Sequence, residues 1–196
     1  MTCRIVNMAF VFLMITSYCD HGSHLILEAD KPAIDTLDSV KVIVPFDRMI
    51  AILQGEILSK NISMKFCQND KFKLLRFINE NECSICQIKS LYQWDEVMDL
   101  IGKDRLDLLL IIRPEKSLEV TTILSILQKN YFSYPVWIDT NSCFYEANTK
   151  LCQTIRETSI LIDPTGNLCY IGNPLLSEAA IKKISLIVSD ARKGPS

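Results

Sequence analysis

Two cysteines separated by two residues, Cys83 and Cys86, are the residues whose types and spacing most directly suggest chemistry. Such a pair can be a redox dithiol, half of a metal site, a static disulfide, or two unrelated core thiols. A zinc site usually needs a second close pair of Cys or His ligands. Cys143 and Cys152 are nine residues apart and both histidines lie near the N-terminus. We therefore expect no metal site, and we weigh a redox dithiol against a static disulfide as the two main alternatives.

The chemistry of the pair depends on the elements that carry it. The apolar residues of segment 72–78 predict a strand just before the cysteines. After Cys83, apolar residues recur at three- and four-residue spacing up to Ile101, which predicts a helix that Gly102 ends. The pair is therefore expected at a strand–helix junction. Cys83 would lie at the helix N-terminus, where unpaired N–H groups and the helix dipole stabilise a thiolate.

This placement predicts a role for each cysteine. Cys83 is expected to be the exposed attacking nucleophile, and Cys86, one turn further along, the partly buried thiol that resolves a mixed disulfide. Glu80 and Glu82 precede the pair, and their charges would oppose thiolate formation, which favours a reductant or a slow exchanger. Gln87 follows Cys86 where haem attachment would need His. We expect no cofactor.

The remaining patterns predict alternating strands and helices. Strands are expected at residues 40–44, 61–67, 106–112 and 135–139, and at a hairpin in 158–174 whose turn is Asp163-Pro164-Thr165-Gly166. Helices are expected over 47–57, over 117–127 after a Ser117 cap, within 141–151, and over 177–188 after a Ser177 cap. This order predicts an α/β fold: a three-layer α/β/α sandwich with a central mixed sheet and an antiparallel hairpin at its edge.

Composition is consistent with one such domain and argues against nucleic acid as a partner. The 196 residues are 48% hydrophobic, so they can bury a sizeable core, and the formal net charge is −2 at pH 7. Binding to nucleic acid needs clustered Lys and Arg, and the sequence has no long run of charge. The eight cysteines are a high count that is more typical of metal sites or exported proteins.

The first residues predict export. An apolar run from Ile5 to Ile15 follows Arg4 and is broken only by Asn7. It is shorter than the roughly 20 residues of a spanning helix and suits the core of a signal peptide. The following residues, Ile15-Thr16-Ser17-Tyr18-Cys19, resemble a bacterial lipobox, which implies a lipid on Cys19, although Tyr18 stands where the pattern has a small residue. A plain secretory signal is the alternative.

These observations predict the organisation and location of the chain. Residues 1–18 form a signal peptide, 19–39 a lipidated N-terminus and tether, 40–192 the folded domain, and 193–196 a tail. The lipid would anchor the protein to a membrane of a bacterial cell envelope, with the domain facing the periplasm, where disulfides can persist.

Beyond the motifs themselves, the chain resembles the thioredoxin-like superfamily over about residues 40–190. The matching stretches are CSIC (83–86), PVWID (135–139) and TSILIDPTGNLCYIGNP (158–174). Within the superfamily the chain looks most like TlpA-like proteins and thiol-specific antioxidant relatives of the bacterial envelope. The resemblance implies a thioredoxin-like three-layer sandwich with its dithiol at the first strand–helix junction.

The sequence also departs from this family pattern. The family usually has a cis-proline just before the first strand of the hairpin, packed against the dithiol, and this position corresponds to Glu157. The resemblance thus implies that Glu157 and Thr158 form the binding segment beside the cysteines. Glu82 replaces a common aromatic residue before the first cysteine. A peroxiredoxin would need Thr three residues before Cys83, where Glu80 stands, so we expect no such peroxidase activity.

Two functions follow as expectations. The first is an enzyme, a membrane-tethered thiol–disulfide oxidoreductase that acts on disulfides of exported proteins through Cys83 and Cys86 and exchanges electrons with an external redox donor. The second is a non-catalytic thioredoxin-like lipoprotein, a binding or structural module in which the same pair is a static disulfide. Of the other cysteines, Cys67 and Cys169 are expected to be core thiols, and a regular helix would hold Cys143 and Cys152 too far apart to bond.

Overall fold

The computed structural model describes residues 40–67, 69–155 and 158–190. The predicted signal peptide, the proposed lipid site at Cys19, the tether and the tail lie outside these residues. Within the described part of the chain, no helix is both long enough and apolar enough to cross a membrane.

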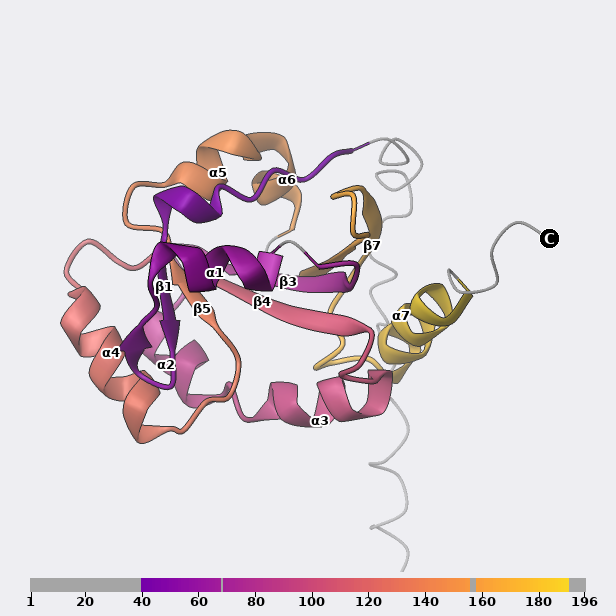
Figure 1. The fold of residues 1–196 in the computed structure, drawn as a ribbon, viewed down its shortest axis with the longest axis horizontal. Helices are drawn as coiled ribbons and strands as arrows, with labels where there is room; N and C mark the ends of the chain where they lie inside the picture. The colour runs from indigo at the N-terminus through magenta and orange to yellow at the C-terminus, as the bar shows by residue number, and fades with distance from the viewer. Residues whose placement is uncertain (1–39, 68, 156–157, 191–196) are drawn as a thin grey trace, which may run out of the picture. The chain divides into compact units, whose positions relative to one another are not determined.

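A mixed sheet of seven strands forms the centre of the domain (Figure 1). Its strands are β1 (Ile50–Leu53), β2 (Glu56–Ile57), β3 (Phe72–Ile78), β4 (Leu106–Ile112), β5 (Val136–Ile138), β6 (Ser159–Ile162) and β7 (Leu168–Gly172), in the order β2-β1-β5-β4-β3-β6-β7. The three central strands β5, β4 and β3 are parallel. β1 and β6 flank them in antiparallel pairing. The C-terminal ends of the central strands β3 and β4 therefore lie side by side at the same end of the sheet.

Helices cover both faces of this sheet (Figure 1). They are α1 (Lys60–Cys67), α2 (Ser84–Lys89), α3 (Gln93–Ile101), α4 (Val120–Lys129), α5 (Cys143–Ala147), α6 (Thr149–Thr154) and α7 (Glu178–Asp190), with a short 3-10 helix, η2 (Phe46–Arg48). Alternate residues of β4 point to opposite cores: Leu108 and Leu110 pack with α2, α3, α4 and α7, whereas Leu109 and Ile111 pack with α5 and α6. The predicted three-layer fold is confirmed.

The elements that carry the strongest local signals lie where the sequence predicted them. β3, β4 and β5 fall within the expected apolar runs. The hairpin β6–β7 turns at Asp163–Gly166, where the Gly166 N–H donates to the Asp163 carbonyl at 3.0 Å. Ser177 caps α7, because its hydroxyl accepts the Ala180 N–H at 3.3 Å. These patterns involve neighbours in sequence and depend little on the rest of the chain.

The expected helix over residues 47–57 is wrong. After η2 the chain forms the antiparallel hairpin β1–β2, which turns through Gln54 and Gly55. Both residues have positive φ, 52° and 81°. Such a turn matches the right-handed twist of paired strands, and glycine adopts it without steric cost. Gly55 was the local signal for a turn, and the apolar spacing around it belonged to a strand that pairs with β5.

The expected strands at 40–44 and 61–67 are also wrong. In the first segment only Lys41 pairs, in an isolated bridge with Asn167, and the chain then leaves the sheet edge towards η2. Residues 61–67 belong to α1. Their alternation of apolar and polar residues fits a strand, but periodicity does not distinguish a strand from a helix in so short a run.

Two helix predictions need smaller corrections. The helix expected from the cysteines to Ile101 is divided into α2 and α3 at residues 90–92, although Gly102 ends it as predicted. The helix expected after a Ser117 cap begins later, with Glu119 at the N-cap of α4.

Candidate redox site

The pair Cys83 and Cys86 lies at the junction between β3 and α2, as the sequence predicted. Cys83 is the N-cap residue of α2, with extended backbone angles. Its carbonyl accepts the Gln87 N–H at 3.0 Å, and its sulfur accepts the Cys86 N–H at 3.2 Å. The first turn of the helix thus directs an N–H group at the Cys83 sulfur, where it would stabilise a thiolate.

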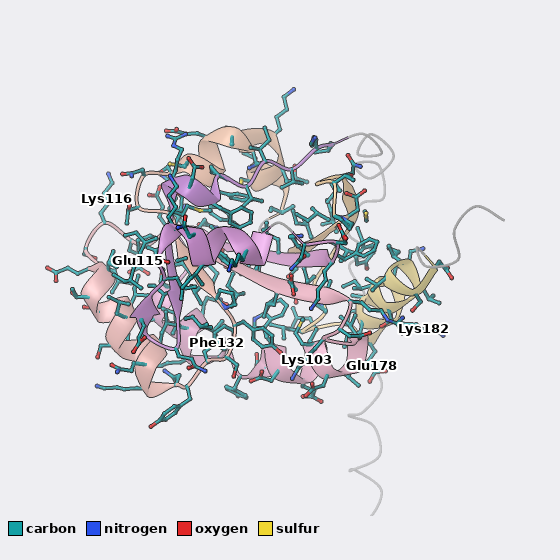
Figure 2. All side chains as sticks on the ribbon, viewed as in Figure 1. Lys103, Glu115, Lys116, Phe132, Glu178 and Lys182 are labelled. Carbon is teal, nitrogen blue, oxygen red and sulfur yellow. A yellow bond between two sulfur atoms is a disulfide. The ribbon has the colours of Figure 1, made fainter. Side chains whose placement is uncertain are left out.

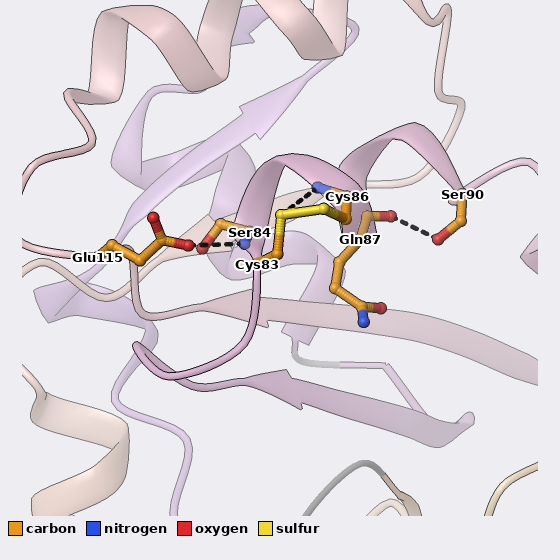
Figure 3. The surroundings of a disulfide bond; sticks show 6 residues. All are labelled: Cys83, Ser84, Cys86, Gln87, Ser90 and Glu115. Atoms are coloured by element: carbon orange, nitrogen blue, oxygen red, sulfur yellow. Dashed lines mark hydrogen bonds between the residues drawn. A yellow bond between two sulfur atoms is a disulfide. The ribbon is translucent and has the colours of Figure 1, made fainter.

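The two cysteines form a disulfide with a Cα–Cα distance of 5.3 Å (Figure 3). Both residues are exposed. The expectation that Cys86 is partly buried is therefore wrong. The inward side of α2 is occupied by Ser84 and Ile88, which are fully buried, and the two cysteines, three residues apart, share the outer side. A partner can reach either sulfur.

Glu115 is a part of the site that the sequence analysis missed. It follows β4, and its Oε1 accepts the N–H of Ser84, the first residue of α2, at 3.2 Å (Figure 3). A carboxylate on this N–H places negative charge beside Cys83 and opposes a thiolate there. Strand order could have indicated Glu115, because the residues that follow neighbouring parallel strands lie close together at the C-terminal end of the sheet.

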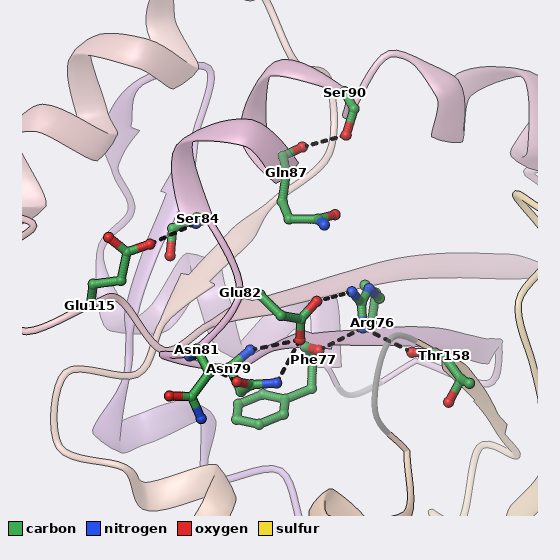
Figure 4. A network of polar contacts seen from close by, with 10 residues as sticks. All are labelled: Arg76, Phe77, Asn79, Asn81, Glu82, Ser84, Gln87, Ser90, Glu115 and Thr158. Carbon is green, nitrogen blue, oxygen red and sulfur yellow. Dashed lines mark hydrogen bonds and ion pairs between the residues drawn. The ribbon is translucent and has the colours of Figure 1, made fainter.

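Glu80 and Glu82 do not act as free charges, because each is paired with an arginine. Glu80 accepts from Arg113 Nη2 at 3.1 Å. Glu82 forms an ion pair with Arg76 in β3 (Figure 4). The sequence expectation that both carboxylates oppose thiolate formation therefore does not follow from their surroundings, and Glu115 is the acidic group that contacts the first turn of α2.

Of the two predicted binding residues, Glu157 lies outside the described residues. Thr158 lies near the loop of residues 79–83 between β3 and α2, called the dithiol loop below. The Thr158 carbonyl accepts from Arg76 Nη1 at 3.2 Å, and the same guanidinium holds Glu82, the residue before Cys83 (Figure 4). The structure thus brings Thr158 and the dithiol loop together through Arg76, which is a contact that the sequence did not reveal.

The remaining cysteines differ in their surroundings. Cys143 and Cys152 are buried and unbonded, as expected. Burial, with Asp139 adding to it, raises the pKa of Cys152 to about 12, so this thiol stays protonated at neutral pH. Cys169 is exposed on the edge strand β7, so the prediction of a core thiol is wrong. Its neighbours still desolvate it enough to raise its pKa. The side chain of Cys67 lies outside the described residues.

A shallow hollow of about 310 Å³ lies beside the dithiol loop at the carboxyl ends of β3 and β4. Its lining includes Asn81, Glu82, Arg113, Tyr145 and Gln153. The Arg113 guanidinium lies over the Tyr145 ring, 5.0 Å from its centroid. Among the described residues, no group of three or more His, Cys, Asp or Glu side chains is placed to hold a metal ion.

Comparisons with known proteins agree with this architecture. No protein-family model matches the sequence, and no curated protein matches it. Among solved structures, two illustrate the similarity in fold. One is a thioredoxin-like protein in its oxidised form, 15% identical, with a TM-score of 0.53, covering 78% of this chain and 97% of that one. The other, from Chlorobium tepidum, is named as a thiol:disulfide interchange protein, DsbE; it is 14% identical, with a TM-score of 0.51 and coverage of 77% and 96%.

At these identities the likeness concerns the fold, and the fold agrees with the motifs CSIC, PVWID and the closing hairpin. The chain therefore has the thioredoxin-like fold, which the resemblance found in its sequence implied.

Proposed function

We propose that this protein is a thiol–disulfide oxidoreductase of the bacterial envelope that acts on the disulfides of exported proteins. The observation that carries the proposal is the exposed Cys83–Cys86 disulfide at the first turn of α2. An inert structural disulfide has no need of exposed sulfurs or of an N–H group directed at one of them. The fold shared with the DsbE protein supports the same class of chemistry.

In the reducing direction the exchange takes two steps. The Cys83 thiolate attacks one sulfur of the client disulfide; that S–S bond breaks, and the leaving client thiolate takes up a proton. The Cys86 thiolate then attacks the Cys83 sulfur in the mixed disulfide and releases the second client thiolate, which is also protonated. The client gains two electrons and two protons, and the protein is left with the Cys83–Cys86 disulfide. An external dithiol reductant must return the pair to the reduced state.

Insulin reduction tests this proposal. The protein, without its first 39 residues, is assayed with dithiothreitol as the electron source, beside Cys83→Ser and the matched control Cys169→Ser, which removes an exposed thiol outside the site. Wild type and Cys169→Ser should accelerate insulin precipitation equally, and Cys83→Ser should lose the acceleration. Equal rates for wild type and Cys83→Ser would rule the proposal out.

We also propose that a lipid on Cys19 tethers the protein to a membrane, on the sequence pattern Ile15–Cys19. Labelling bacteria that express the full chain with a radioactive fatty acid tests this part alone. Wild type should carry label that Cys19→Ala loses. Label that persists in Cys19→Ala, or that is absent from both, argues for a plain secretory signal or for no export.

A non-catalytic scaffold is the second candidate, because Glu157 stands where the family has proline and Glu115 places a negative charge on the first turn of α2. Equilibration with a dithiol buffer separates the two candidates. A reduction potential far below about −300 mV indicates a static structural bond, and a higher one indicates an exchangeable pair.

A further inference from the structure

An ion pair is buried directly behind the dithiol loop. Arg76 projects from β3 and pairs with Glu82, and only 7% and 10% of the two side chains are exposed. Burial of two charges is costly unless they are paired and their remaining hydrogen-bonding groups are satisfied. This buried pair, whose Glu82 directly precedes Cys83, therefore depends on the hydrogen bonds that complete it.

The contacts of the pair join two segments that are far apart in sequence (Figure 4). Arg76 Nη1 donates to the carbonyls of Phe77 at 2.9 Å and Thr158 at 3.2 Å. The second oxygen of Glu82 accepts from the backbone N–H of Asn79 at 3.2 Å and from its side-chain amide at 2.7 Å. One guanidinium thus holds both the loop that leads to Cys83 and Thr158, the residue just before β6.

We propose that Arg76 and Glu82 form a positioning pair for the redox site: they fix the dithiol loop against Thr158 and balance the charge beside Cys83. This inference rests on the proposed exchange function and deepens it. In the superfamily pattern a proline before the hairpin packs against the dithiol, and here Glu157 occupies that position. The buried pair provides a polar connection between the same two segments.

The charge balance leads to an expectation that packing alone would not give. Glu82→Gln leaves a buried guanidinium without its counter-ion next to Cys83, which favours the thiolate. Arg76→Met leaves a carboxylate there instead, which opposes the thiolate. The double variant Arg76→Met/Glu82→Gln restores neutrality. The two single variants should therefore shift the reactivity of Cys83 in opposite directions, and the double variant should return towards wild type.

The experiment measures two properties of the reduced protein without its first 39 residues: the pH dependence of iodoacetamide alkylation at Cys83 and the reduction potential of the pair. The alkylation midpoint should fall by about one pH unit in Glu82→Gln and rise by about one in Arg76→Met. The potential should rise in the first and fall in the second. Asp99→Asn, which breaks the exposed ion pair between Asp99 of α3 and Lys103 just beyond that helix, is the matched control and should change neither property.

Shifts of the same sign in the two folded single variants, or no shift in either, would overturn the proposal. If a single variant does not fold, Arg76→Lys decides. Lysine keeps the charge but cannot contact Glu82 and both carbonyls together, so the potential should hold while exchange with a protein disulfide slows several-fold; an unchanged rate would overturn the positioning role. Absence of insulin reduction by wild type would defeat the proposed function alone, since alkylation and potential do not require turnover.

Discussion

At the scale of single residues, the acidity of the dithiol depends on charges that α2 does not itself carry. Glu115 contacts the first turn of α2 through the Ser84 N–H, and in the described part of the chain no ion pair involving Glu115 is found. Glu115→Gln removes this charge but leaves an amide oxygen that can still accept the Ser84 N–H. Cys83 should then react several-fold faster with iodoacetamide at pH 7, and the reduction potential should rise.

Glu178→Gln is the control for this prediction, because it removes the same charge from α7. Figure 2 shows Glu115 and Glu178 on opposite sides of the domain. The control should leave both the alkylation rate and the potential unchanged. A Glu115→Gln protein with wild-type alkylation kinetics across pH 6–9 would show that the carboxylate serves only to cap the helix.

Cys152 gives a prediction about pH and stability. Burial raises its pKa to about 12 in the folded protein, whereas an unfolded thiol titrates near 8.5. Between these two pKa values the folded state retains a proton that the unfolded state loses. The contribution of Cys152 to the free energy of unfolding is therefore fully present below about pH 8 and falls as pH rises through this window. Urea unfolding at pH 7.5 and 10.5 should show that the free energy of unfolding falls less between these pH values in Cys152→Ala than in wild type. An equal loss in both would exclude a contribution from this thiol.

At the scale of secondary structure, the turn between β1 and β2 determines how that hairpin meets α4. Gly55 has φ of 81°, and a Cβ added there would meet the Cβ of Gln128. Gly55→Ala should therefore destabilise the protein by about 1–3 kcal/mol, from the strained backbone and the displaced helix contact. The neighbouring Gln54 also has positive φ, 52°, but glycine would relieve strain there, so Gln54→Gly should be neutral or stabilising by up to about 1 kcal/mol. Urea unfolding measures both. Equal effects would contradict this account of the turn.

The same turn illustrates which elements the sequence could predict. The β6–β7 hairpin and α7 are specified by residues within a few positions of one another, and both were predicted. The segment before residue 68 was not, because β1 exists only through its pairing with β5, some 85 residues later. Apolar residues near Met49 and Ile50 fit a helical spacing as well as a buried edge of the sheet, and only the distant partner strand selects between them.

At the scale of the whole molecule, the sequence located the two sulfurs and the two preceding glutamates, but not the arginine partners of those glutamates or the contact of Glu115. Cys83 and Cys86 were found because their signal is contained within four residues. Glu115 reaches Ser84 across 31 positions, and Arg76 reaches Thr158 across 82. These contacts arise from the order of strands in the sheet, so the reactivity of the dithiol could be inferred only after the fold was known.

The direction of exchange is also a property of the whole molecule, because folding and oxidation are linked in one thermodynamic cycle. The disulfide closes a loop of about four residues and so lowers the entropy of the unfolded chain. In the chain-entropy model this raises the free energy of unfolding of the oxidised protein by about 2 kcal/mol. The charge of Glu115 adds to this by disfavouring the reduced thiolate form. We therefore predict that the oxidised protein is more stable to urea than the reduced protein by about 2 kcal/mol. That difference places the potential of the pair about 40 mV below that of the unfolded chain, as in a reductant.

The measurement compares urea unfolding with and without a strong reductant, and Cys83→Ser/Cys86→Ser is the control whose stability should not respond to reductant. A reduced form more stable than the oxidised form would contradict the prediction that the protein is a reductant. In that case the first turn of α2, with the Cys86 N–H directed at the Cys83 sulfur, would stabilise the thiolate more than Glu115 opposes it. The protein would then be an oxidant, as is a disulfide oxidoreductase whose reduced state is the stable one.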